Sequence, residues 1–276
     1  MIGKKIKIGI SSILAVTTIL MGTSIIASAE TNINTNLREN EDSQYWAKHF
    51  ESFNNDLESG KLVKLKDAST VYLKYTVDEN NEEVVEEFTE KEYEQERLKE
   101  KITRYGIGSF EPNGNCSWLK LDLQVYENSA GKYNVYSFWE WKTRPKCRFT
   151  DINGIYVSSE FVISNGPIQT QYIAQDDNGN EVFEHPSYKI SEFGNGVASS
   201  FRLKGDSELF TYVYNMGMTS AQVEFANSAS RSGRIFTNYV HGQIALGDIS
   251  FDSQGKPSFG LNVSTDQHSG SVYISR

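Results

Sequence analysis

The sequence predicts a mainly β protein: an antiparallel β-sandwich, or a barrel-like relative of it, with a small N-terminal α/β attachment. Three observations support this prediction. From residue 107 onward, short runs of alternating apolar and polar residues are separated by turns rich in Gly, Asn and Asp. No helical period intervenes between these runs. No repeat of fixed length is present, which disfavours a propeller or a solenoid.

The N-terminal residues have the pattern of a secretory signal peptide. Lysines precede an apolar stretch over residues 8–21, and small residues occupy positions 27–29. Residues 1–29 are therefore predicted to be removed, with cleavage after Ala29. A membrane anchor would need about 20 unbroken apolar residues, and Ser and Thr interrupt this stretch. We expect a secreted, extracellular protein.

Residues 30–104 are predicted to form an acidic segment made of a helix, a hairpin and a second helix. Trp46, Phe50, Phe53 and Leu57 recur at helical spacing and indicate a helix with one buried face. Alternating strands follow at 70–78 and 83–88, and Thr89 with Glu92 forms a capping box for the second helix, which is expected to end near Lys101.

The segment from Asp78 to Glu100 contains eleven acidic and three basic residues. It is either an acidic cation-binding or inhibitory pro-segment or, as charge runs usually are, a solvated face. Whether residues 30–104 stay docked or are cleaved off is left open. Residues 105–276 are predicted to form the β-sandwich domain, with strands at 119–125, 133–141, 155–164, 168–175, 197–204, 208–216, 221–226, 235–245, 258–263 and 272–275. Turns are predicted at Gly217 and at Ser232-Gly233, among other places.

An apparent hairpin from Lys132 to Ser164 holds the most distinctive residues. Its first strand is apolar on both faces, which is typical of a strand covered on both sides. Flat aromatic rings and a row of cations can bind sugars, lipid interfaces or anionic polymers. Alternatively, the rings fill the sandwich and the cations protect a sheet edge. The candidate binding residues are Trp139, Trp141, Lys142, Arg144, Lys146 and Arg148.

Cys116 and Cys147 are the two cysteines of the chain. Because export places them where disulfides persist, we predict a Cys116–Cys147 bridge. Two buried thiols are the alternative.

The sequence contains no recognisable catalytic, cofactor or metal motif. The four histidines are far apart and lack metal-ligand spacing. The run from Asp176 to Glu181 fails the calcium-loop template, which requires glycine where Glu181 stands. A pair of carboxylates could hydrolyse a glycosidic bond, and the candidates near the hairpin are Asp122, Glu140, Asp151 and Glu160. We expect no cofactor and no metal. Catalytic residues stay unknown.

Charge argues against one class of partner. The chain has a net charge of −9, and nucleic acids favour a basic protein face.

The arrangement WEWKTRPKCRFTDINGIYV after a signal peptide resembles uncharacterised exported β-rich proteins of Gram-positive bacteria. The resemblance implies an extracellular β-domain and carries no activity.

Together these observations favour a secreted, non-enzymatic β-domain that binds a cell-surface polymer, a glycan or an anionic membrane surface. Two alternatives are a membrane-active toxin of the pore-forming type, with residues 217–247 refolding into a barrel hairpin, and a secreted hydrolase with a dispersed carboxylate site. A structural role in an extracellular matrix is a further possibility.

Overall fold

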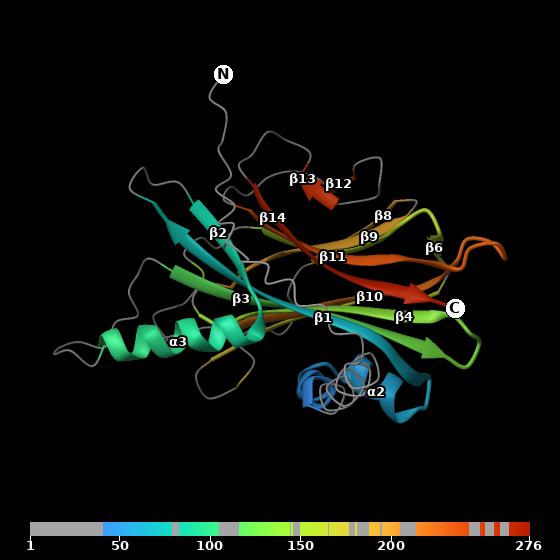
Figure 1. The fold of residues 1–276 in the computed structure, drawn as a ribbon, viewed down its shortest axis with the longest axis horizontal. Coiled ribbons are helices and arrows are strands. Elements are labelled where there is room, and N and C mark those ends of the chain that lie inside the picture. The colour runs from blue at the N-terminus through green and yellow to red at the C-terminus, as the bar shows by residue number, and fades with distance from the viewer. Residues whose placement is uncertain are drawn as a thin grey trace, which may run out of the picture.

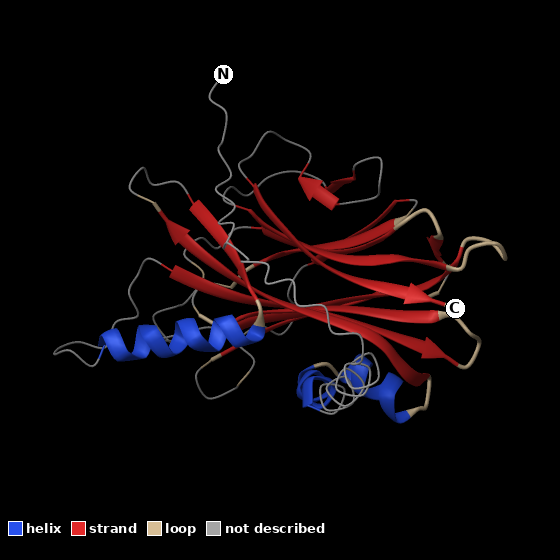
Figure 2. Ribbon diagram, viewed as in Figure 1, coloured by secondary structure: helices blue, strands red, loops and turns tan. Residues whose placement is uncertain are grey.

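The computed structural model of the protein describes residues 41–276 apart from 79–82, 105–115, 144, 146–149, 165, 177–179, 181–187, 194, 205–213, 243–248, 252–256 and 260–264. It confirms the predicted fold class. Two antiparallel sheets pack face to face, and helices lie on the outer side of one of them (Figures 1 and 2). The predicted signal peptide lies outside the described residues.

The first sheet, here called sheet A, has seven strands in the order β2-β1-β3-β4-β10-β6, and β7 also pairs with β10. All of these pairs are antiparallel. Its strands are β1 (Leu62–Val77), β2 (Glu83–Phe88), β3 (Cys116–Asn128), β4 (Tyr133–Trp141), β6 (Phe161–Ile163), β7 (Gln169–Gln175) and β10 (Tyr214–Phe225).

The second sheet, sheet B, has five strands in the order β14-β11-β5-β9-β8. They are β5 (Thr150–Val157), β8 (Tyr188–Phe193), β9 (Gly196–Arg202), β11 (Ser232–Gly242) and β14 (Thr265–Ser275). A short hairpin of β12 (Ile249–Phe251) and β13 (Pro257–Phe259) contacts β5 and β9 and lies on the outer side of this sheet (Figure 1). At one edge the sheets meet: β1 contacts β14, and the backbone N–H of Tyr273 donates to Asp67 Oδ2 at 3.3 Å.

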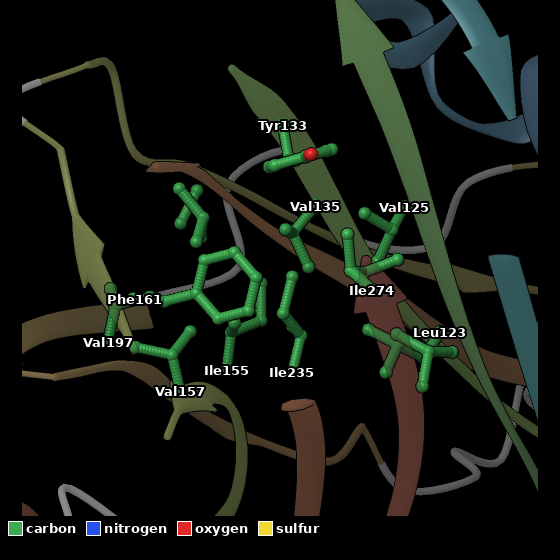
Figure 3. Close-up of a cluster of buried hydrophobic side chains, with 13 residues drawn as sticks. Leu123, Val125, Tyr133, Val135, Ile155, Val157, Phe161, Val197, Ile235 and Ile274 are labelled. Carbon is green, nitrogen blue, oxygen red and sulfur yellow. The ribbon is translucent and has the colours of Figure 1, made fainter. Parts of the chain in front are cut away.

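The core between the sheets is built from the inward-facing side chains of both. Leu123, Val125 and Val135 of sheet A meet Ile155 and Ile235 of sheet B in one apolar cluster (Figure 3). A second cluster surrounds Trp139 and Trp141 of β4. Burial of these alternating residues explains why their pattern predicts strands, since every second side chain of a strand points to the same face.

Hydroxyl and amide side chains connect the two sheets in the middle of the core. Ser137 of sheet A hydrogen-bonds Thr237 of sheet B and accepts a bond from Asn153 Nδ2 at 2.7 Å. Ser199 of sheet B hydrogen-bonds Thr219 of sheet A at 2.6 Å. All five side chains are buried. Because an unpaired polar group in the core is costly, these bonds favour one alignment of the sheets over others.

The first predicted helix is confirmed, with a break that the sequence did not indicate. Residues 41–49 are helical, Phe50 is extended with φ of −120°, and α2 (Glu51–Glu58) follows. Trp46, Phe50 and Phe53 are fully buried against the outer face of sheet A, as their spacing predicts. Among the described residues, no helix is long and apolar enough to span a bilayer.

The capping box of the second helix is also confirmed. The backbone N–H of Thr89 donates to Glu92 Oε2 at 2.8 Å, and the N–H of Glu92 donates to Thr89 Oγ1 at 3.4 Å. These bonds satisfy backbone donors at the start of α3 (Glu90–Arg104), which extends a few residues beyond the predicted end. They also lower the pKa of the Glu92 carboxyl, because they stabilise its charged form.

The segment predicted as an attachment supplies two strands of sheet A. β1 pairs with β3 from Leu62↔Asn128 to Thr76↔Cys116, and β2 pairs with the other edge of β1. Sequence periodicity alone does not indicate which strands pair, so this connection was not predicted. The division at residue 104 as a boundary between domains stays a prediction.

Two predicted turns are wrong. Gly217 lies within the continuous strand β10, and Ser232-Gly233 begins β11. In both places an aromatic ring covers the glycine: a Cβ on Gly217 would lie 2.4 Å from the Trp139 ring, and one on Gly233 would lie 2.7 Å from the Phe161 ring. These glycines therefore provide space for rings instead of turning the chain.

Candidate functional site

The two tryptophans of the predicted binding hairpin lie in the core. Trp139 and Trp141 are each 1% exposed. Trp139 stacks on Phe201 with 4.3 Å between ring centroids, and Trp141 Nε1 donates to Tyr239 Oη at 3.0 Å. The rings fill the sandwich, which is the architectural alternative considered above. Their use as a surface platform for a ligand is not supported, because neither ring faces solvent.

The expected hairpin is wrong, because β4 belongs to sheet A and β5 to sheet B, so the two strands do not pair. The cations between these strands are only partly described. Lys142 is half-buried, and its Nζ lies 2.9 Å from both carboxylate oxygens of Glu140. Arg144, Lys146 and Arg148 lie outside the described residues, so a binding role for this row stays a prediction.

The predicted disulfide is not tested. Cys116 is half-buried at the first position of β3. Its expected partner, Cys147, lies outside the described residues.

The four candidate carboxylates do not assemble into one site. Asp122 is buried on the outer face of sheet A, where it accepts hydrogen bonds from Trp46 Nε1, Thr70 Oγ1 and Gln124 Nε2 at 2.7–2.8 Å. Glu140 is on the same face but is paired with Lys142. Asp151 lies between the sheets, and Glu160 lies in the turn before β6. Complete burial and three hydrogen-bond donors give Asp122 a structural role, since a catalytic acid or base must be able to reach a substrate.

Asp151 belongs to a buried hydrogen-bond network. Tyr239 Oη donates to Asp151 Oδ2 at 2.5 Å, and His241 Nδ1 lies 3.0 Å from both oxygens of the same carboxylate. Burial raises the pKa of the Tyr239 phenol well above its usual value, and the Asp151 charge raises it further. Because all three side chains are closed to solvent, the network holds β5 against β11 and is not open to a substrate.

The segment proposed for refolding into a barrel hairpin is divided between the sheets. β10 belongs to sheet A and β11 to sheet B, so the two strands do not pair with each other. A membrane-inserted form stays a prediction.

A group of aromatic and basic side chains lies on the outer face of sheet B, and we call it the aromatic-basic face: Tyr156, Arg234, Phe236 and Tyr273. Arg234 and Tyr273 are exposed, Phe236 is half-buried and Tyr156 is buried. Arg234 is directly opposite Tyr273 in the β11–β14 pair, and Phe236 is opposite Tyr156 in the β11–β5 pair. The rings of Tyr156 and Phe236 stack, with centroids 4.7 Å apart and planes 6° from parallel. Tyr273 is 59% exposed.

Two further guanidinium groups lie at the end of the same strands. Arg231 precedes β11 and Arg276 follows β14, and the Nη1 of each donates to the carbonyl oxygen of Ser228 at 3.2 Å. Arg231, Arg234 and Arg276 are all exposed. Within the part of the chain that the structure describes, none of the three forms an ion pair. They give a local positive charge to a protein whose net charge is −9.

Another part of the outer face of sheet B is covered. Ile152, Ala198 and Val240 form a small buried cluster there, and β13 contacts β5 and β9 beside it. The aromatic-basic face is at the opposite end of β5, toward the C-terminus of β14 (Figure 1).

Sequence reasoning missed the aromatic-basic face. Alternation does place Arg234 with Phe236 and Ser271 with Tyr273 on one side of their strands. It does not tell which side stays open to solvent, because that depends on where the β12–β13 hairpin and the helices pack.

Comparison with known proteins gives no family. No protein-family model matches the chain, and no curated protein matches it. Among solved structures it is similar to the collagen-binding domain of a Staphylococcus aureus adhesin, with 7% identity, coverage of 49% of this chain and 86% of that one, and a TM-score of 0.25. The KRT10-binding region domain of the pneumococcal serine rich repeat protein PsrP has 13% sequence identity to this chain. The match covers 76% of this chain and 99% of that one, with a TM-score of 0.29. A structure described as a pore forming protein has 9% sequence identity to this chain. The match covers 60% of this chain and 89% of that one, with a TM-score of 0.28. TM-scores this low do not establish a shared ligand.

Proposed function

We propose that this protein is a secreted, non-enzymatic β-domain that binds an anionic surface polysaccharide through the aromatic-basic face. The observation that carries the proposal is the exposed Tyr273 ring directly opposite Arg234, on the uncovered part of sheet B. This face takes the place of the central hairpin as the candidate binding surface.

The chemistry of the face suits such a polymer. An exposed phenol ring packs against the apolar side of a sugar ring, and its hydroxyl hydrogen-bonds the polar edge. A guanidinium binds a carboxylate or sulfate through two parallel N–H bonds. Tyr and Arg are also the residues that most often dominate binding energy at interfaces. Because Arg234 lies opposite Tyr273, and Arg231 and Arg276 lie at the ends of the same two strands, an anionic polymer is favoured over a neutral one.

The test is binding of the secreted protein to immobilised alginate, heparin and dextran, which are carboxylated, sulfated and neutral. We expect retention on one or both anionic polymers, weakening with salt. Tyr273→Ala and Arg234→Ala should each weaken the affinity at least about fivefold, since each removes one central contact. Both side chains are exposed, so the variants should keep the wild-type circular dichroism spectrum.

The matched control is Arg202→Ala. Arg202 is also exposed and is the last residue of β9, opposite Thr150 in β5. It is therefore about 20 Å along β5 from Tyr156, at about 3.3 Å per residue. Its removal lowers the positive charge equally but should leave binding unchanged. The proposal is overturned if wild type binds none of the polymers, if Arg202→Ala weakens binding as much as Arg234→Ala, or if only vesicles containing phosphatidylglycerol are bound.

A further inference from the structure

Two arginines converge on one carbonyl oxygen at the end of sheet B where β11 begins and β14 ends, beside the C-terminus marked in Figure 1. Arg231 Nη1 and Arg276 Nη1 each donate to the carbonyl oxygen of Ser228 at 3.2 Å. The two Nη1 atoms are therefore at most about 6.4 Å apart, which is twice the length of either bond. We call this pair of arginines the arginine clamp.

Backbone and ring contacts hold the clamp in place. The backbone N–H of Arg276 donates to the carbonyl oxygen of Arg231 at 2.9 Å, which extends the β11–β14 pairing by one step. The Arg276 guanidinium lies over the Phe225 ring, with 4.7 Å between Cζ and the ring centroid. In the turn that carries Ser228, Asn227 Oδ1 accepts from two backbone N–H groups at 2.9 and 3.0 Å. The two guanidinium groups are thus positioned before a ligand arrives, which lowers the entropy lost on binding.

The positive charge of the clamp is not neutralised by a carboxylate within the described part of the chain. Glu224 is the acidic residue nearest to Arg231 in sequence, and it pairs with Lys132 Nζ at 2.9 Å. Glu160 lies in the turn before β6, which pairs with the end of β10, and its carboxyl is hydrogen-bonded to the Ser158 side chain. Two like charges as close as those of the clamp repel each other, so an anion that contacts both is favoured.

The arrangement suits a group with three terminal oxygens and two negative charges. A carboxylate has two oxygens in one plane and is satisfied by the fork of a single guanidinium. A phosphate monoester has three terminal oxygens and a charge of about −1.5 to −2 at pH 7, so it can accept from both guanidinium groups at once. Each guanidinium has five N–H groups and uses one of them for Ser228, so donors remain on both for a ligand.

We propose that the arginine clamp binds a phosphate monoester, and that the anionic group of the surface polysaccharide is a phosphate carried on its sugars. The second part rests on the proposed function. Arg276 is three residues beyond Tyr273, which is about 10 Å along the strand. A polymer held at the clamp by its phosphate therefore reaches the aromatic-basic face.

The first experiment titrates the secreted protein at low ionic strength with four forms of one sugar: glucose 6-phosphate, glucose 6-sulfate, glucuronate and glucose. Calorimetry or protein NMR shifts give the affinity. We expect glucose 6-phosphate to bind with a Kd of about 1 mM. The sulfate and the carboxylate should bind at least about threefold more weakly, since each has a single negative charge, and glucose should not bind.

The double variant Arg231→Lys/Arg276→Lys keeps the charge of the clamp but loses both planar forks. It should weaken the binding of glucose 6-phosphate at least about fivefold. Both arginines are exposed, so the variant should keep the wild-type fold. The matched control is Arg202→Lys, which makes the same change at an exposed arginine beside the other end of β5 and should bind as wild type does.

The second experiment tests the polymer with dextran phosphate, dextran sulfate and unmodified dextran, the two charged forms having equal degrees of substitution. We expect dextran phosphate to be retained most strongly, and we expect the double variant to lose this preference. Tyr273→Ala should weaken retention of the polymer but bind glucose 6-phosphate as wild type does, which separates the clamp from the aromatic-basic face.

The clamp is ruled out if glucose 6-phosphate does not bind at about 50 mM, if it binds no more tightly than the sulfate or glucuronate, or if the double variant binds it as wild type does. The proposed function then still stands or falls by retention on alginate and heparin. If the clamp binds glucose 6-phosphate but dextran phosphate is retained no better than dextran, the assignment of phosphate to the polymer is wrong.

Discussion

At the residue scale, close contact between Gly217 and Trp139 connects sequence to packing. Gly217 is directly opposite Trp139 in the β10–β4 pair, and the indole lies over the position where a Cβ would be. The ring also stacks on Phe201 of sheet B. The indole therefore fills the space between two sheets only because its neighbour in the strand has no side chain.

We predict that Gly217→Ala destabilises the protein. A Cβ would lie 2.4–2.5 Å from three atoms of the indole, and the ring cannot move freely because it is buried. Overpacking of this kind costs about 1–3 kcal/mol. Urea unfolding monitored by tryptophan fluorescence measures the free energy of unfolding. A decrease below about 0.5 kcal/mol would contradict the prediction.

A double-mutant cycle isolates the contact. The atom nearest to the added methyl group, Cζ2, lies farther from the backbone than any atom of a phenylalanine ring. In a Trp139→Phe background, Gly217→Ala should therefore cost less than in wild type. If Gly217→Ala lowers the free energy of unfolding equally in both backgrounds, the effect comes from the backbone and not from the ring.

The sequence predicts part of this local structure. Alternation along residues 133–141 places Trp139 and Trp141 on one side of β4 together with Val135, and that parity is confirmed. It does not predict that Gly217 lies under an indole, because glycine at a turn and glycine beneath a ring have the same local signature. In the same way, alternation alone does not distinguish tryptophans that fill the core from tryptophans on the surface, because that depends on how the two sheets pack.

At the element scale, the helix over residues 41–49 packs on sheet A through both apolar and polar contacts. Trp46 stacks on Phe138 with 4.8 Å between centroids, and its Nε1 donates to Asp122 at 2.8 Å. Lys120 Nζ pairs with Asp42 Oδ1 at 3.0 Å and lies over the rings of Tyr45 and Trp46. Burial alone would lower the pKa of the Lys120 ammonium group. The nearby carboxylates, Asp122 first among them, outweigh this effect, so the pKa of Lys120 is raised.

We predict that Trp46→Phe destabilises the protein by about 1–3 kcal/mol. The ring stacking on Phe138 would be kept in part, but the buried Asp122 carboxylate would lose one of its donors, and an incompletely bonded buried charge is costly. Thermal and urea unfolding measure the change. Ser52→Ala, which removes a single bond of the next helix to β7, should cost clearly less. Equal effects of the two substitutions would show that the Trp46 N–H to Asp122 bond adds nothing.

The elements of the N-terminal segment were largely predictable, whereas their pairing was not. Local signals define the helix stripe and the Thr89 capping box, and both are confirmed. The pairing of β1 with β3 joins Leu62 to Asn128, across most of the acidic segment. No local pattern encodes such a pairing, because many strands of similar alternation compete for the same edge.

At the scale of the whole molecule, the fold leaves each sheet with a different outer surface. Helices cover the apolar part of sheet A. The β12–β13 hairpin covers one end of sheet B and leaves the aromatic-basic face. The fold class was predictable, since period-two alternation and frequent turns require it. The aromatic-basic face was not, because its existence depends on which part of sheet B stays uncovered.

The many buried tyrosines make the stability of the whole molecule sensitive to alkaline pH. Among the described residues, burial is the largest cause that raises the pKa of six tyrosines, and a nearby carboxylate raises it further in each; the six are Tyr45, Tyr72, Tyr133, Tyr136, Tyr172 and Tyr239. The folded state therefore holds these protons more tightly than the unfolded chain, whose tyrosines ionise near about pH 10. By linkage, their contribution is fully present below that pH and is lost as the pH rises above it.

We predict that the free energy of unfolding falls steeply above about pH 10 and that most tyrosines ionise only as the protein unfolds. Urea unfolding at a series of pH values gives the free energy, and absorbance at 295 nm with near-ultraviolet circular dichroism follows ionisation and tertiary structure together. Tyr239→Phe removes one of these protons, so its destabilising effect near pH 7 should shrink at about pH 11. Phe201→Leu changes a residue of the same buried cluster that has no ionisable group. It should lower the free energy of unfolding by the same amount at both pH values. Full ionisation of the tyrosines with an unchanged near-ultraviolet spectrum would show that the phenols are not held neutral by the fold.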